Sequence, residues 1–298
     1  MDLVDQLRAF VATAQAGSFT AAGEQLGLSN RLTSKYVAEL ETRLGVRLFQ
    51  RTTRRVGLTP SGADLLARAP ALLDDLDALL GEVSEGSRGF SGVIRVSAPV
   101  TFGEVYVTGM LERFARANPN LSFDLRLDDR YVDLASDGID LAFRLGRSEM
   151  LSLKMKRMGA WRAVLVASPD YIAANGAPQT PEDLEGHACI LDTNRAQPRR
   201  WVFERDGQQI VRQVQGRFHV NSARAAVELA RRGMGLAYVP RFALHAALAE
   251  GAVTALMGDH EGESGPVSAV YLEGRALPRK IRALIDFAAE DITRADIL

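Results

Sequence analysis

Glycines at positions 17, 27 and 45 divide the first 45 residues into three short segments. In the first segment the apolar residues recur with helical spacing and share one face: Leu3, Leu7, Phe10, Val11 and Ala14. Glycine readily adopts the left-handed conformation that ends a helix, so each glycine marks a helix end. Ser18 and Ser29 stand where helix N-caps are needed, which predicts two further helices over 19–26 and 30–44.

A pair of short strands is predicted after the third helix. Polar and apolar residues alternate over 46–51 and again over 54–58, on either side of Thr52 and Thr53. This alternation is typical of a hairpin or wing. Thr59, Pro60 and Ser61 then start another helix, with proline near its first position.

The helix that follows Thr59 carries a heptad pattern. The apolar residues of its a and d positions are Leu65, Ala69, Leu72, Leu76, Leu79 and Val83, and Leu66, Leu73 and Leu80 flank them. The pattern fits either a core helix of one domain or a linker helix over 61–88 through which two copies dimerise. Pro70 should kink the helix or split it, because proline interrupts helical hydrogen bonding.

Charge is distributed unevenly along the chain, although the formal net charge is only −1. Residues 1–60 carry eight Lys/Arg against five Asp/Glu, whereas residues 61–88 carry two against six. Five arginines follow one another between positions 43 and 55 with no acid among them. A basic module on a neutral body is typical of a protein that binds phosphate at one end, so the net charge does not exclude a nucleic-acid partner.

The run 86–92 is rich in glycine and serine and is the clearest linker in the chain. Beyond it, strands are predicted over 93–97, 121–127, 139–143, 165–167, 235–239 and 267–271, and helices over 102–117, 131–136, 222–232 and 277–292. A capped helix is also expected after Ser168. Alternation of strands and helices indicates parallel βαβ units in an open sheet.

The first sixty residues resemble the LysR-type transcriptional regulators in three ordered stretches. FTAAGEQLGLS at 19–29 is similar to the helix-turn opening of that family, LETRLGVRLFQRT at 40–52 to its recognition-helix exit and wing, and LTPSG at 58–62 to the start of its linker helix. The resemblance continues at 94–99, 132–134, 140–146, 166–169, 183–184, His187, 189–190 and Trp201.

The resemblance implies a fold class as well as a function. It implies an N-terminal all-α winged helix-turn-helix domain over 1–60, a long linker helix over 61–88 and a C-terminal α/β effector domain over 92–298. The effector domain would have two subdomains, like a periplasmic solute-binding protein: subdomain I at about 92–163 and 267–298, and subdomain II at about 164–266. The chain would cross between them near Ala163 and near Pro266.

The DNA contacts follow from the helix-turn-helix geometry, in which the N-terminal residues of the second helix reach base edges in the major groove. The exposed candidates are Asn30, Arg31, Thr33, Ser34 and Lys35, with Thr20 and Ser29 beside them. Arg31 suits a bidentate contact with guanine and Asn30 one with adenine, unless both are simply solvated. Arg51, Arg54 and Arg55 in the wing are expected to meet phosphate or the minor groove. The family often has Gln-Pro or Pro-Ser where this chain has Asn30-Arg31, so the operator of a relative is not carried over.

An effector site is expected beyond the carboxyl ends of strands, where open α/β sheets bind ligands. The candidates are Val100, Thr101, Phe102, Arg144, Gly146 and Asn221. Thr101 and the N–H groups of the helix that follows would hold an anion, and Arg144 would either supply the counter-charge or form a surface ion pair. The sequence is most similar to the branch of the family whose effectors are often small carboxylates or aromatic compounds. Closure of the cleft on an effector would change the spacing of paired DNA-binding domains.

Catalysis, metal binding and membrane insertion find little support. Gly233-Met234-Gly235 precedes a strand and lacks the third glycine of a dinucleotide site, and no G-x-S-x-G or H-E-x-x-H motif occurs. The four histidines lack metal-ligand spacing, so no catalytic residue, metal or cofactor is predicted apart from the effector. Cys189, the single cysteine, is expected to be a buried apolar side chain. No stretch has signal-peptide or membrane-spanning character, so we expect a cytoplasmic protein without a membrane partner.

The predicted function is a sequence-specific DNA-binding transcriptional regulator whose activity a small-molecule effector controls. Its expected partners are double-stranded operator DNA, the effector and further copies of itself, as dimers through the linker helix and as the tetramers common in the family. RNA polymerase is a further candidate partner. A DNA-binding repressor that needs no ligand and a solute-binding protein are the alternative functions.

Overall fold

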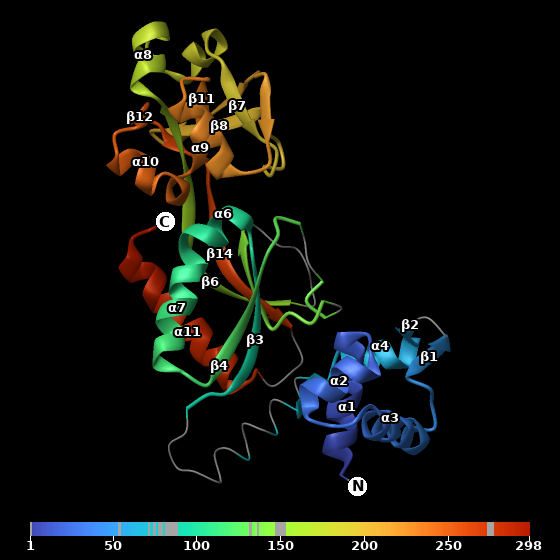
Figure 1. The fold of residues 1–298 in the computed structure, drawn as a ribbon. Helices are drawn as coiled ribbons and strands as arrows, with labels where there is room; N and C mark the ends of the chain where they lie inside the picture. The colour runs from blue at the N-terminus through green and yellow to red at the C-terminus, as the bar shows by residue number, and fades with distance from the viewer. Residues whose placement is uncertain are drawn as a thin grey trace. The chain divides into compact units, whose positions relative to one another are not determined.

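A computed structural model describes residues 2–298 except 53–54, 71, 74–75, 77–79, 81–88, 131–132, 136, 147–152 and 273–276. The side chains of Arg51, Thr52 and Arg55 are also outside the described set. The chain divides into two compact units, the first comprising residues 1–92 and the second most of residues 93–298 (Figure 1).

The first unit begins with helices at the predicted positions: α1 (Leu3–Ala16), α2 (Phe19–Leu26) and α3 (Asn30–Leu44). The hydroxyls of Ser18 and Ser29 cap α2 and α3 by accepting backbone N–H groups of the first turn. Each of the three glycines ends its helix at a φ between 62° and 71°, which glycine adopts without steric strain.

An antiparallel wing follows α3, with β1 (Phe49–Thr52) paired to β2 (Arg55–Leu58). The first strand begins later than predicted because the N–H groups of Leu48 and Phe49 donate to a carboxylate on α3. Phe49 packs against Phe10 and Phe19 with ring centroids 5.4 and 5.7 Å apart. These contacts fix the wing to the helices.

Helix α4 (Pro60–Leu66) is capped by Thr59, whose Oγ1 accepts the N–H of Gly62. It ends at Leu66, and residues 67–68 form a turn before helical residues resume at Ala69. The break confirms the interruption predicted for Pro70, because proline has no N–H to donate to the carbonyl four residues back.

The heptad pattern after Thr59 divides between two environments. Leu65, Ala69 and Leu73 pack into the apolar core of the first unit, whereas Leu72 and Leu80 are exposed. Two of the a and d positions, 79 and 83, lie outside the described residues. The first two of the a and d positions, Leu65 and Ala69, therefore belong to the core of the first unit, and the predicted dimer contact stays a prediction.

The second unit contains, among the described residues, a mixed sheet in the order β10-β7-β11-β6-β14-β5-β3-β4, with β12 paired to β6. Its strands are β3 (Gly92–Ala98), β4 (Leu121–Leu127), β5 (Leu141–Leu145), β6 (Leu153–Ala167), β7 (Cys189–Asp192), β10 (Phe218–Val220), β11 (Leu236–Pro240), β12 (Thr254–Leu256) and β14 (Ser264–Leu272). A smaller sheet is formed by β8 (Arg200–Arg205), β9 (Gln208–Gln213) and β13 (Glu261–Gly262).

Helices cover this sheet. They are α6 (Val100–Phe102), the π-helical turn η1 (Gly103–Val107), α7 (Thr108–Ala117), α8 (Pro169–Asn175), α9 (Ala223–Arg231), α10 (His245–Ala249), α11 (Arg279–Ala295) and the 3₁₀ turns η2 (Pro181–Gly186) and η3 (Arg241–Ala243). Figure 1 shows α7 and α11 against the strands β3 and β4, and α9 and α10 beside β11 and β12.

Strands β6 and β14 carry the chain between two lobes of the second unit. Strand β6 pairs with β14 over 153–162 and with β11 over 163–166. The chain therefore leaves lobe I (β3–β5, α6–α7 and α11) at about Ala163 for lobe II (β7–β13 and α8–α10), and it returns at about Pro266.

Three details of this unit differ from the predictions. The sheet does not consist of parallel pairs alone, since β14 runs antiparallel to both β5 and β6. Of the predicted helix 131–136, the described residues are not helical: Leu134 and Ala135 form a turn, and the carbonyl of Leu134 accepts the N–H of Ile139. Strand β6 is much longer than the predicted strand 165–167, because its charged first half hides the apolar pattern.

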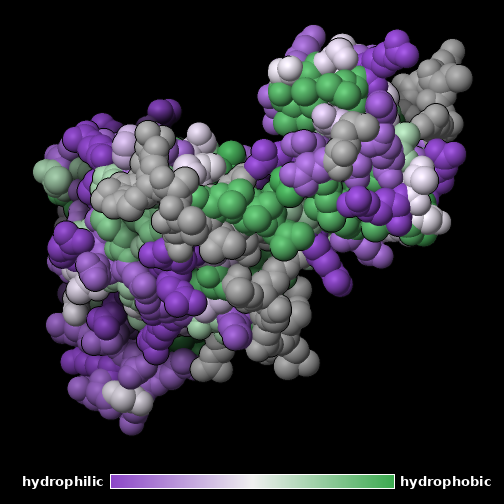
Figure 2. Space-filling model, turned by 90° about the horizontal axis from the view of Figure 1, so that it is seen from below, coloured by the Kyte–Doolittle hydropathy of each residue, from purple (hydrophilic) through white to green (hydrophobic). Residues whose placement is uncertain are grey.

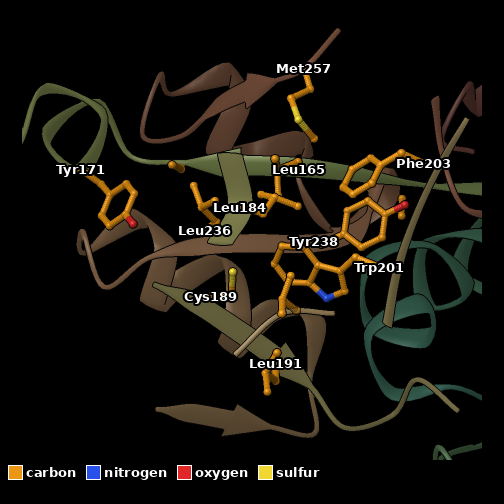
Figure 3. Close-up of a cluster of buried hydrophobic side chains, with 13 residues drawn as sticks. Leu165, Tyr171, Leu184, Cys189, Leu191, Trp201, Phe203, Leu236, Tyr238 and Met257 are labelled. Carbon is orange, nitrogen blue, oxygen red and sulfur yellow. The ribbon is translucent and has the colours of Figure 1, made fainter. Parts of the chain in front are cut away.

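The core of lobe II surrounds Trp201 and Tyr238 (Figure 3). The Tyr238 ring lies 5.2 Å from Trp201 and 5.0 Å from Phe203, measured between centroids. Cys189 belongs to the same buried cluster, and burial raises the pKa of its thiol to about 12. Its expected role as a buried apolar side chain is confirmed.

Hydrophilic residues cover much of the face shown in Figure 2, and hydrophobic residues gather there in patches. The large apolar side chains that are exposed are Leu3, Leu44, Val46, Leu72, Leu80 and Met155. Within the described part of the chain, every helix is too short or too polar to cross a membrane.

Candidate functional site

The turn between α2 and α3 brings these helices together at Gly23. The carbonyl of Gly23 accepts the N–H of Leu28 over 2.8 Å. A Cβ atom on Gly23 would lie 2.8 Å from the carbonyl oxygen of Leu28 and 3.2 Å from Oγ1 of Thr33. A side chain here would displace the backbone of the turn, so glycine allows the close approach that places the N-terminus of α3.

A hydrogen-bonded group of polar side chains lies on the outer side of this turn. Nδ2 of Asn30 donates to Oγ1 of Thr20 over 3.1 Å, and the Ser34 hydroxyl donates to Oδ1 of Asn30 over 3.4 Å. Asn30 and Thr20 are exposed. These bonds orient the Asn30 amide, which retains one N–H and an acceptor lone pair for a base edge.

Arg31 and Lys35 are exposed beside this group. Lys35 lies 4.0 Å from Glu39, whereas Arg31 has no ion-pair partner among the residues that the structure describes. Ser29 is exposed too, but its hydroxyl accepts the N–H of Leu32 as the helix cap. Asn30, Arg31, Ser34 and Lys35 therefore share an accessible N-terminal part of α3.

The prediction that Thr33 is exposed is wrong. Its side chain is fully buried, and its hydroxyl donates to the carbonyl of Ser29 over 3.1 Å. The reason is the phase of the helix, because Thr33, Val37 and Leu40 recur on the buried face of α3. Thr33 shapes the turn and does not face solvent.

The wing arginines lie largely outside the described residues. Arg51 and Arg55 belong to the backbone of β1 and β2, but nothing is described of their side chains, and Arg54 is outside the described residues altogether. Their predicted phosphate contacts remain predictions.

Glu41 is a buried acid that the sequence analysis did not single out. Its carboxylate accepts the N–H groups of Leu48 at 2.8 Å and Phe49 at 3.1 Å and pairs with Arg47 at 3.0 Å. Burial alone would raise the pKa of Glu41, but these hydrogen bonds and the Arg47 charge lower it below its ordinary value. An acid beside Val37 and Leu40 on the apolar face was the signal that would have identified it.

A cavity of about 870 Å³ lies between the two lobes of the second unit, within the size range of small-molecule sites. Its main apolar lining residues are Phe102, Trp161, Ala223 and Phe242, and its main polar ones are Thr101, Asp129, Asp192, Asn194, Arg195, Arg200 and Glu263. The N–H groups of Thr101 and Phe102 lie in the first helical turn, where no intrahelical acceptor is available.

Three of the six predicted effector residues, Thr101, Phe102 and Gly146, line this cavity. The N–H of Val100 instead donates to Asp129, and the carbonyl of Asn221 accepts from Asn194.

Arg144 does not line the cavity. Its guanidinium donates to Oγ of Ser97 over 3.2 Å and to the carbonyl of Phe143 over 3.1 Å. It is therefore not placed as a counter-charge for a ligand in this cavity. Its alternative role, a surface ion pair, stays a prediction.

The segment from the last residue of β7 to the first residue of β8 supplies three of the five charged lining residues that sequence analysis missed, namely Asp192, Arg195 and Arg200. The rule that ligands bind beyond strand ends applies to it. The rule for strand ends could not be applied here from the sequence, because β7 is only four residues long and was not predicted as a strand.

Two of the charged lining residues neutralise each other. Arg195 pairs with Glu263, and its guanidinium carbon lies 4.8 Å from the centroid of the Tyr238 ring. The Tyr238 hydroxyl in turn accepts the N–H of Glu263 over 2.5 Å. This chain of contacts holds both charged groups at the cavity wall.

Asp192 is a buried carboxylate in the same wall. Its Oδ1 accepts the backbone N–H of Asn194 over 3.0 Å. Burial raises the pKa of Asp192, and the nearby Asp129 adds to the rise, while the Asn194 hydrogen bond and Arg195 oppose it.

Contacts between the lobes border the cavity. Nδ2 of Asn194 in lobe II donates to Oδ2 of Asp129 in lobe I over 2.9 Å. Arg224 on α9 pairs with Glu104 on η1 at 2.9 Å. The Phe102 and Phe242 rings meet edge to face with centroids 5.3 Å apart. The described structure therefore has the lobes in contact across the cleft.

No group of three or more histidine, cysteine, aspartate or glutamate side chains placed to hold a metal ion occurs among the described residues.

Comparisons with known proteins agree with this organisation. Residues 4–63 match the family described as bacterial regulatory helix-turn-helix protein, lysR family, and residues 87–293 match the LysR substrate binding domain. The HTH-type transcriptional regulator PtxR of Pseudomonas aeruginosa is 33% identical over 291 residues, covering 98% of this chain and 93% of its own. An HTH-type transcriptional regulator of Haemophilus influenzae is 32% identical over 284 residues, covering 95% of this chain and 99% of its own.

Solved structures agree as well. CrgA, a LysR-type transcriptional regulator from Neisseria meningitidis, is 28% identical with a TM-score of 0.63, over 96% of this chain and 98% of its own. The full-length virulence activator AphB of Vibrio cholerae is 25% identical with a TM-score of 0.61, over 97% of this chain and 99% of its own.

Proposed function

This chain belongs to the LysR family of bacterial transcriptional regulators, and we propose that a small molecule in the cavity of its second unit controls how the first unit binds an operator. The observation that carries the proposal is the cavity itself, which both lobes line with polar and apolar groups. A ligand that contacts both lobes stabilises one relative arrangement of them, and only such differential binding can shift a conformational equilibrium.

The DNA-reading surface comprises the exposed residues at the start of α3 together with the wing. Asn30 and Arg31 contact base edges, and Thr20, Ser34 and Lys35 position the helix on the groove. Two copies join through residues 61–88, where Leu72 and Leu80 present exposed apolar side chains. The paired first units then read two half-sites of the operator.

Replacing Arg31 with alanine is expected to reduce operator affinity by about 1–3 kcal/mol at one base step while changing affinity for scrambled DNA much less. The physical reason is that a bidentate guanidinium–guanine contact is lost only where that guanine is present. Arg54→Ala is expected to weaken binding to both DNAs equally and to flatten the salt dependence, since it removes a phosphate contact. Fluorescence anisotropy titrations on both DNAs at several salt concentrations measure these effects. Equal losses on the two DNAs for Arg31→Ala would contradict its role in reading a base.

A metabolite panel tests the effector part of the proposal. We expect at least one small metabolite to raise the melting temperature of the second unit, because a ligand at a hundredfold excess over its Kd stabilises the folded state by about 2.7 kcal/mol. Gln197→Phe places a larger side chain at the cavity lining and is expected to remove this shift. Gln209→Phe, on an exposed position of β9 away from the cavity, is the matched control. A panel that gives no shift with the unmodified protein counts against effector control.

A further inference from the structure

The charged groups around the cavity do not balance. Carboxylates of Asp129, Asp192 and Glu263 line it, against the guanidinium groups of Arg195 and Arg200. The Arg195–Glu263 pair removes one charge of each sign. Two carboxylates and one guanidinium remain, so a ligand that carries only negative charge would meet a net repulsion.

The two remaining carboxylates have different environments. Asp129 is satisfied on both oxygens, since Oδ1 accepts the N–H of Val100 at 3.1 Å and Oδ2 accepts Nδ2 of Asn194 at 2.9 Å. Asp192 accepts only the Asn194 N–H on Oδ1, and its Oδ2 has no hydrogen-bond donor in the part of the chain that the structure describes. A buried carboxylate with a free acceptor position is stabilised by a cationic donor, and an ammonium group supplies both the charge and the hydrogen bond.

Other groups around the cavity are hydrogen-bond donors, and these require an acceptor on the ligand. Arg200 has no carboxylate partner among the described residues. The hydroxyl of Thr101 and the first-turn N–H groups of Thr101 and Phe102 add uncharged donors. These groups are suited to a carboxylate. Phe102, Ala223 and Phe242 provide apolar wall for the rest of a ligand.

We propose that the effector is a small zwitterion, an amino acid or a close relative, whose ammonium group binds Asp192 and whose carboxylate binds the donors around Thr101 and Arg200. The inference rests on the proposed function, because it names the chemical class that the same cavity takes. It narrows the expectation of a small carboxylate or aromatic compound, since neither of these supplies a cation for Asp192.

Isothermal titration calorimetry of the full chain with L- and D-amino acids tests the inference. For the amino acid that binds most tightly, two matched probes follow: the same molecule without its amino group, and the same molecule without its carboxyl group. We expect each truncated probe to lose at least tenfold in affinity, because each leaves one set of buried polar groups without a partner.

Asp192→Asn gives a second measurement of the same contact. The variant is expected to lose at least tenfold in affinity for the amino acid while its affinity for the deaminated probe stays equal or rises. Asp170→Asn, on an exposed position at the start of α8, is the matched control and should bind like the unmodified protein. If Asp192→Asn does not fold, the comparison of the amino acid with its two truncated probes on the unmodified protein still tests the inference.

The outcomes separate the inference from the proposed function. If a carboxylate or aromatic metabolite without an ammonium group binds and no amino acid does, the zwitterion inference is overturned while effector control stands. Equal affinity for an amino acid and its deaminated form also overturns the inference. If no small molecule binds at all, both the inference and the proposed effector control fail.

Discussion

Replacing Glu41 with alanine is expected to abolish operator binding while the second unit stays folded. The substitution removes the acceptor of two backbone N–H groups, those of Leu48 and Phe49, at the point where α3 leads into the wing. Leaving two buried donors without partners costs about 2–5 kcal/mol, a large share of the stability of a small domain. The wing would lose its fixed place against α3, and the DNA-reading surface with it.

The chain offers a direct way to separate the two units in this experiment. Both of its tryptophans, Trp161 and Trp201, lie in the second unit, so intrinsic tryptophan fluorescence follows the unfolding of that unit. Operator titrations follow the first unit. Glu24→Ala removes an exposed acid from α2 and is the control. Operator affinity equal to that of Glu24→Ala would contradict the role assigned to Glu41, as would a shifted tryptophan transition.

Acidification should reproduce part of the effect. The pKa of Glu41 lies below its ordinary value of 4.5 in the folded chain, so the folded state binds the proton less tightly than the unfolded state does. The stability that the ionised carboxylate contributes is therefore fully present above about pH 4.5 and is lost as the pH falls through the folded value. Glu41→Gln, which cannot titrate, is expected to lack this contribution at every pH.

Local signals explain why the first unit was largely predictable. Caps at Ser18 and Ser29 and the three helix-ending glycines act within a few residues of sequence, and the structure has them where the pattern indicates. The errors there concern the direction of side chains. Thr33 was assigned to the exposed face because the phase of α3 depends on what packs against it, and here Gly23 and the α2 backbone do.

The cavity was less predictable because its walls come from distant parts of the sequence. Thr101 and Gly146 could be placed by the rule for strand ends. Asp192 ends, and Arg195 follows, a four-residue strand whose partners, β10 and β11, lie much further along the chain. Arg144 also lies near the carboxyl end of its strand, yet its guanidinium donates to Ser97. A strand-end rule fixes the position of a residue along a strand but not the direction of its side chain.

A buried network behind the cavity gives the second large effect. Tyr106, in the π-helical turn after Thr101 and Phe102, donates to Oδ2 of Asp291 over 3.0 Å. Nε and Nη2 of Arg113 donate to the two oxygens of the same carboxylate at 2.9 and 2.6 Å. The hydrogen bond from Arg113 lowers the pKa of Asp291 against the effect of burial, and the bond from Tyr106 lowers it further. One carboxylate on α11 thus anchors the helical segment that begins with the effector residues.

Asp291→Ala is therefore expected to destabilise the second unit by about 2–4 kcal/mol, less than for a fully enclosed pair because Arg113 is half exposed. Its tryptophan fluorescence transition should move to lower denaturant, and effector affinity should fall because Thr101 and Phe102 are no longer held in place. Glu290→Ala removes the neighbouring acid, whose pair with Arg294 at 3.9 Å is exposed, and is expected to change stability by less than about 1 kcal/mol. If the two variants unfold alike, the network does not support the cavity. Tyr106→Phe deletes only the hydroxyl. Its stability should lie between those of Asp291→Ala and Glu290→Ala, because it removes one hydrogen bond and leaves the Arg113–Asp291 pair intact.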